Sequence, residues 1–103
     1  MTTQEILKQT TSPTKISILC WTLAKPEGVT VSDLTELMKV ERSNISKQIS
    51  EMKEVGLLEM KTEGRFNYYF LSNDLELIQI DLIKNIVNSF HIIDENKRDF
   101  VKY

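Results

Sequence analysis

The sequence predicts a mostly α-helical domain that carries one small β-hairpin. In several segments apolar residues recur at intervals of three and four, as one buried face of a helix requires. Residues 57–71 alternate instead and are rich in Tyr and Phe, which suit strands. Glycine and proline are scarce and fall between these segments, so they mark where the elements end.

Two helices are expected in the first quarter of the chain. Thr3 to Gln9 forms a short helix in this prediction. Ser12 begins the second helix, because serine caps helix N-termini and Pro13 is tolerated at the first helical position. Its apolar residues recur at helical spacing as far as about Ala24: Ile16, Leu19, Cys20 and Leu23.

Residues from about 30 to 56 have the pattern of a helix-turn-helix. Thr30 and Asp33 have the spacing of a capping box, which opens a short helix. A break of about four residues follows, and Ser43 then starts or lies just inside a longer helix that ends at Gly56. Two helices joined by so short a turn are typical of this motif.

The rest of the chain predicts a hairpin and a final helix. Residues 57–71 form two strands with the charged tip Glu63-Gly64-Arg65. Ser72 or Asn73 caps a long apolar helix that runs to about Phe90, within a dimerisation segment of about 73–93. In this order the elements form one winged helix-turn-helix domain spanning residues 1–103, in which the hairpin is the wing.

The predicted second helix of the helix-turn-helix carries the candidate DNA-binding side chains. In such motifs this helix enters the major groove with its N-terminal residues at the base edges. The residues there are cations and short hydrogen-bonding groups: Arg42, Ser43, Asn44, Ser46, Lys47 and Gln48. Arg65 at the wing tip is expected to reach phosphates or the minor groove. The alternatives are an ordinary solvated helix face and a solubilising turn.

The charge balance leaves a second function open. The net charge is −2, whereas DNA-binding domains are usually basic. Between Lys39 and Arg65, however, the acids mostly avoid the start of the predicted recognition helix, with Glu41 as the exception. We therefore predict a protein that binds double-stranded DNA. The alternatives are a winged-helix protein-interaction module that does not bind DNA and a regulator with a small-molecule pocket between helices.

The last helix is too apolar for a single buried face. From Leu75 to Ile93 about 11 of 19 residues are apolar. Leu75, Ile78, Leu82 and Ile86 form one stripe, whereas further apolar residues lie well around the helix from it: Leu77, Ile80 and Val87. A surface helix needs only one stripe about 100° wide. The second set predicts a homodimer in which this helix packs against a symmetry mate.

The segment from Ser12 to Leu71 resembles the ArsR-type (arsenic-repressor-like) family of repressors. The matching stretches are Ser12-Pro13-Thr14-Lys15-Ile16, Val31-Ser32-Asp33-Leu34, Arg42 to Ile49, Val55-Gly56-Leu57-Leu58 and Glu63 to Leu71. The resemblance implies a dimeric winged-helix repressor whose first and last helices form the interface. The predicted interface residues are therefore Ile6 in the first helix together with Leu77, Ile80 and Val87 in the last. It also implies base contacts from around Arg42, Ser43, Ser46, Lys47 and Gln48.

The usual metal ligands of that family have no counterparts here. Thr30 and Ser32 stand where metal-sensing members carry two cysteines, and the last helix has His91 without a paired histidine. Zinc needs about four N, S or O ligands, and soft metals want thiolates. We predict a repressor with no metal and no cofactor. One histidine and one cysteine at opposite ends of the chain also argue against an enzyme.

The remaining features concern cellular location. No run of about 18 apolar residues exists, and the polar start of the chain does not resemble a signal peptide. The single cysteine, Cys20, is expected to be a buried core residue rather than a redox switch. These features predict a cytoplasmic protein without a membrane partner.

Overall fold

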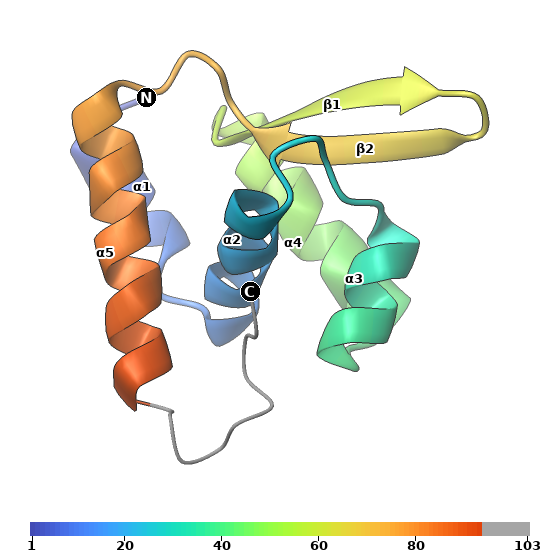
Figure 1. Ribbon diagram of the computed structural model, residues 1–103, viewed down its shortest axis with the longest axis horizontal. Coiled ribbons are helices and arrows are strands. Elements are labelled where there is room, and N and C mark those ends of the chain that lie inside the picture. The colour runs from blue at the N-terminus through green and yellow to red at the C-terminus, as the bar shows by residue number, and fades with distance from the viewer. Residues whose placement is uncertain (94–103) are drawn as a thin grey trace.

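The computed structural model describes residues 1–93, with side chains as far as Phe90; the charged segment 94–103 and the side chain of His91 lie outside the described residues. The elements follow in the order α1 (Thr3–Gln9), α2 (Pro13–Ala24), α3 (Val31–Met38), α4 (Arg42–Glu54), β1 (Leu58–Glu63), β2 (Phe66–Leu71) and α5 (Leu77–Ile93) (Figure 1). The fold class is therefore confirmed: a winged helix-turn-helix with one antiparallel hairpin.

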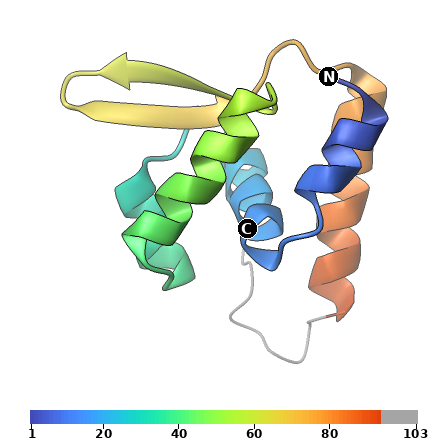
Figure 2. The same ribbon diagram turned by 180° about the vertical axis from the view of Figure 1, so that it is seen from behind.

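Helix α2 lies at the centre of the molecule and contacts α5, α4 and β2. Helices α1 and α5 lie side by side on one side of it, whereas α3, α4 and the hairpin lie on the other (Figures 1 and 2). Every helix and the base of the hairpin contribute to one core: Ile6, Ile16, Ile18, Leu19, Cys20, Val29, Leu34, Ile45, Ile49, Met52, Leu57, Leu58, Leu75, Ile83 and Val87. This core joins the helix-turn-helix to α1 and α5 in a single unit.

The first helices begin where local capping is available. The Thr2 hydroxyl accepts a hydrogen bond from the Glu5 amide while the Glu5 carboxylate accepts one from the Thr2 amide, a complete capping box before α1. Ser12 caps α2 by accepting from the Lys15 amide at 3.3 Å, and Pro13 is the first helical residue. The predicted bounds of both helices are confirmed.

The helix-turn-helix follows the predicted pattern. The Thr30 hydroxyl accepts from the Asp33 amide at 3.0 Å, and the Asp33 carboxylate accepts from the Thr30 amide at 3.2 Å. Lys39 ends α3 in the left-handed conformation, with φ of 57°. Helix α4 begins at Arg42, so that Ser43 lies just inside it. Glu41 is the N-cap residue but makes no side-chain capping bond.

The hairpin has a two-residue loop, because Glu63 pairs with Phe66 across it. Gly64 occupies the first central position with φ of 62°, the residue and sign that a type II′ turn requires. At its base, Tyr69 exchanges two backbone hydrogen bonds with Val29, of 2.8 and 2.9 Å. The wing is thereby attached to the loop that precedes α3.

The start of α5 differs from the prediction. The helix begins at Leu77, not at Asn73, although Ser72 is a suitable cap by sequence. The Glu59 carboxylate on β1 accepts hydrogen bonds from the Ser72 hydroxyl at 2.6 Å and the Asn73 amide at 2.9 Å. These contacts hold the linker against the wing, and the chain turns helical only where Gln79 reaches back to accept from the Glu76 amide at 3.0 Å.

The core-facing stripe of α5 also differs from the predicted one. Its buried residues recur at intervals of four: Leu75 just before the helix, then Gln79, Ile83 and Val87. Ile78, which the sequence pattern places on the inner stripe, is 76% exposed. Because α5 carries two apolar stripes, the sequence pattern alone does not decide which of them faces the core.

Among the described residues, no helix combines the length and apolar character needed to cross a membrane.

Candidate nucleic-acid interface

Helix α4 separates an apolar face from a polar one. Ile45, Ile49 and Met52 are buried against the core. At 3.6 residues per turn the opposite side carries Ser43, Lys47, Ser50 and Glu54, spaced by four, three and four residues. The first three place hydroxyls and one ammonium group along a free helix surface. This surface can hydrogen-bond to base edges and attract phosphate.

The other candidate residues of α4 flank this central row. Arg42, Asn44 and Ser46 are exposed, whereas Gln48 is half-buried because it lies closer to the core-facing side. The Gln48 side-chain amide donates to the Asn44 side-chain oxygen at 3.1 Å. This bond holds the two amides together, yet leaves each with further donors or acceptors for a base.

Arg42 connects the two helices of the motif. Its guanidinium donates a hydrogen bond to the Ser32 hydroxyl at the start of α3. The Arg42 side chain is exposed, so the charge sits at the surface where α3 and α4 begin. Ser32 is not among the predicted site residues, because a contact between side chains ten positions apart has no signature in the sequence. Ser50 was missed although it follows Ser43 by seven residues, a spacing that places both on one face.

Three acidic residues of α4 and the wing are engaged in other contacts, whereas Glu54 lies exposed on the polar face of α4 itself. Glu51 accepts from the Lys15 ammonium of α2 at 2.8 Å, and the Lys15 side chain is only 11% exposed. This hydrogen bond and the positive charge of Lys15 hold the pKa of Glu51 below its ordinary value. Glu63 lies 3.9 Å from the Lys61 ammonium, and Glu59 holds the linker before α5. Although the chain has a net negative charge, the carboxylates of these three residues each have a partner within the protein.

The wing extends away from the body of the protein (Figures 1 and 2). The turn between β1 and β2 lies on the same side of α2 as α3 and α4, opposite α1 and α5. Arg65 in this turn is exposed. Strands of six residues reach about 20 Å, which is comparable to the width of a DNA duplex. Recognition helix and wing tip can therefore approach one duplex together.

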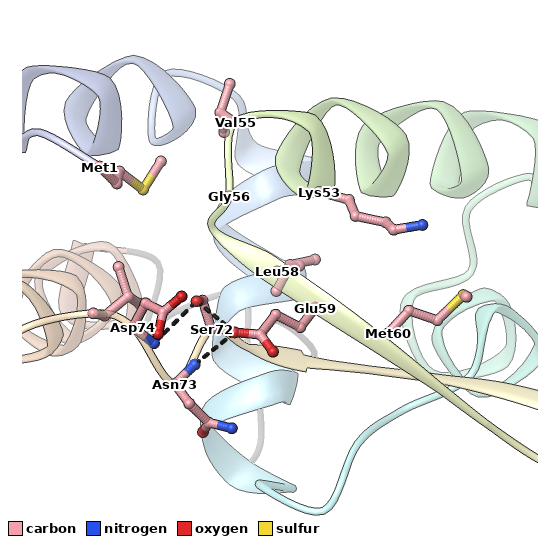
Figure 3. A pocket seen from close by; sticks show the side chains of 11 residues that line it. Met1, Lys53, Val55, Gly56, Leu58, Glu59, Met60, Ser72, Asn73 and Asp74 are labelled. Atoms are coloured by element: carbon pink, nitrogen blue, oxygen red, sulfur yellow. Dashed lines mark hydrogen bonds between the residues drawn. The ribbon is translucent and has the colours of Figure 1, made fainter.

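A cavity of about 730 Å³ lies where the C-terminal end of α4, strand β1 and the linker to α5 meet (Figure 3). Glu59, Ser72 and Asn73 form the hydrogen-bonded cluster on one wall, and Ser72 also accepts from the Asp74 amide at 3.1 Å. Apolar side chains of Leu58 and Leu75 contribute to the lining. The cluster ties the wing to the helix that follows it.

Within the part of the chain that the structure describes, no three His, Cys, Asp or Glu side chains come together to hold a metal ion. Thr30 and Asp33 are occupied in capping α3, and Ser32 is bonded to Arg42. Cys20 is fully buried in α2, as predicted. Burial raises the pKa of the Cys20 thiol to about 12, so the reactive thiolate is scarce at neutral pH.

The four residues predicted for the dimer interface divide into two groups. Ile6 and Val87 are enclosed in the core of the single chain, with exposed fractions of 0% and 1%. Both lie on the inner faces of α1 and α5, which pack against each other. Leu77 is 81% exposed and Ile80 is half-buried.

A helix-turn-helix joined to a hairpin wing is the architecture of winged-helix DNA-binding regulators. The model of the family described as "Helix-turn-helix domain" matches residues 2–61, more than half of the chain. The protein therefore belongs to the helix-turn-helix domain family. No curated protein matches the chain.

Several solved structures have the same fold. HlyU from Vibrio cholerae, in its reduced form, is 20% identical with a TM-score of 0.65, over 85% of this chain and 83% of that one. A predicted DNA-binding transcriptional regulator from E. coli is 20% identical with a TM-score of 0.67, over 87% and 86% of the two chains. The transcriptional repressor BigR from Xylella fastidiosa is 17% identical with a TM-score of 0.67, over 92% and 85%. At these identities the likeness concerns the fold.

Proposed function

We propose that this protein is a homodimeric, sequence-specific repressor that binds double-stranded DNA, of the ArsR type but without that family's usual metal-sensing sites. The observation that carries the proposal is the polar face of α4. Ser43, Lys47 and Ser50 line it opposite a fully buried apolar face, while the nearby Glu51 is held by Lys15. A cytoplasmic protein of this kind needs no cofactor to bind its operator.

The contacts divide by chemistry. Ser43, Ser46 and Gln48 read bases from the major groove, and Lys47 adds a charge on the same face. Arg42 and Asn44 flank them, with Arg42 near the phosphates beside the start of α3. Arg65 in the wing holds the backbone or the minor groove.

The dimer uses the outer surface of α5. Leu77 and Ile78 are 81% and 76% exposed at its start, and α1, which contacts α5, carries the exposed Leu7. Large apolar side chains gathered at one end of a helix are unfavourable in water, and covering them with a second copy lowers the free energy. An isologous pair would present two recognition helices to two half-sites.

Selection of bound duplexes from a random pool tests the proposal, because a dimer that reads bases returns a consensus with two-fold symmetry. Affinity for the selected duplex should fall steeply with salt. Gln48→Ala should relax preference at one base pair per half-site, worth about 1–3 kcal/mol, with the salt slope unchanged. Arg65→Ala should weaken binding to all DNA sequences alike. It should also lower the slope of log affinity against log salt concentration by about one unit for each phosphate that a subunit no longer neutralises.

The same experiment separates the alternative. A winged-helix module that binds only protein would return no enriched sequence and no salt-dependent binding to any duplex. If Arg65→Ala changes sequence preference strongly while Gln48→Ala changes nothing, the protein binds DNA but the wing is the reading element.

A further inference from the structure

The two faces of the wing carry different side chains. Residues paired directly across an antiparallel hairpin point to the same face. One face therefore carries a row of aromatic rings on β2, each opposite a charged residue on β1: Phe66 with Glu63, Tyr68 with Lys61 and Phe70 with Glu59. The other face carries Leu58 with Leu71, Met60 with Tyr69 and Thr62 with Asn67.

The aromatic row becomes more exposed toward the tip. Phe70 and Tyr68 are half-buried, and the Cβ of Tyr68 lies directly over Gly28. Phe66 lies beyond this support and is 54% exposed. Its ring meets the ring of Tyr68 edge-on, with centroids 6.4 Å apart and planes 60° apart. Phe66 is thus an apolar group held at the end of the wing by the ring behind it.

The charges around Phe66 favour contact between the tip of the wing and a polyanion. Arg65 precedes it in the turn, and the Lys61 ammonium lies 3.9 Å from the carboxylate of Glu63. These three side chains together carry one positive charge, so Glu63 does not make the tip repel phosphate.

The geometry points to Phe66 as an apolar wedge that enters the minor groove of duplex DNA beside Arg65 and bends it. With α4 in the major groove, the groove next along the duplex is the minor groove. It is about 6 Å wide, too narrow for a β-ribbon but wide enough for a single side chain at a tight turn. Phe side chains that partly unstack a base step kink DNA, at lowest cost at flexible pyrimidine–purine steps. This inference rests on the proposed function and adds a specificity determinant to it.

The test compares Phe66→Ser with Met60→Ala, a matched change to an exposed apolar residue on the opposite face of the same hairpin. The probe is the duplex selected from the random pool, with 2-aminopurine placed at successive steps of the flanking minor groove. Phe66→Ser should bind roughly tenfold more weakly, with an unchanged salt slope because no charge is removed. It should also lose the bend measured by fluorescence transfer and the 2-aminopurine signal. Met60→Ala should behave as the wild type.

Two further readouts separate the possible failures. Phe66→Leu keeps an apolar wedge and should retain the bend, and thermal melts establish that each variant is folded. If Phe66→Ser binds and bends DNA as well as Met60→Ala does, while Gln48→Ala still alters preference, the wedge is wrong and the proposed function stands. If the wild type enriches no duplex, the proposed function fails and the wedge falls with it.

Discussion

Gly28 should be the least replaceable of the three glycines, and Gly28→Ala tests how the wing is attached. Its φ of 117° is rarely adopted by residues with a side chain, which costs about 1–3 kcal/mol. An added Cβ would also lie 2.8 Å from the Cβ of Tyr68. That atom is fixed to the backbone of β2 and cannot rotate away, so the strand itself must move from the loop that precedes α3.

Gly56 and Gly64 provide matched controls. Their φ values are 86° and 62°, but an added Cβ would meet no atom within 4 Å at either position. Alanine there should cost only the conformational strain, about 1–2 kcal/mol. Gly28→Ala should cost at least about 1 kcal/mol more than either control, since overpacking adds roughly 1–3 kcal/mol.

Urea unfolding followed by circular dichroism measures these differences, at one protein concentration because dimerisation would contribute to stability. A destabilisation of about 1 kcal/mol should also lower the melting temperature by about 4–8 °C in a domain of this size. Equal destabilisation by Gly28→Ala and Gly64→Ala would refute the reasoning. Such a result would mean that the loop and β2 separate freely and that the contact between Gly28 and Tyr68 does not constrain the wing.

The other predictions concern the thiol, the ion pair, the dimer and metal ions. Cys20 should react with a thiol reagent at pH 8 only after unfolding, because burial raises its pKa to about 12; rapid reaction of the native protein would contradict this. Lys15 lowers the pKa of Glu51 in the folded state, so the pair stabilises the protein above the ordinary value of 4.5, and this contribution is lost as pH falls through the lowered pKa. The urea midpoints of wild type and Glu51→Gln should therefore converge at acidic pH, and a constant gap would exclude that role. Leu77→Glu should yield monomers in sedimentation at micromolar concentration, with exposed Glu76→Gln as control; a monomeric wild type would exclude the proposed dimer. Zinc, cadmium and arsenite should not release the protein from DNA, and release that a chelator reverses would reveal a missed site.

Contacts between neighbours in the chain explain why much of the fold was predictable. Ser12 and Thr30 cap their helices through groups only three positions away, and such bonds form wherever the short segment occurs. Ile45, Ile49 and Met52 had to share a face because helical periodicity places them there. The polar start of α4 as a candidate site follows from the same periodicity.

Contacts between distant segments were decided by the tertiary structure. Glu59 lies 13 residues before Ser72, yet its carboxylate binds Ser72 and Asn73 in the linker, and α5 begins only at Leu77. Lys15 lies 36 residues before Glu51, so by sequence alone that carboxylate counts against DNA binding. Such pairs leave no periodic signature, because only packing of the helices around the core brings them together. Local hydrogen bonds and periodicity therefore determined the elements, whereas the core decided which surface each element presents.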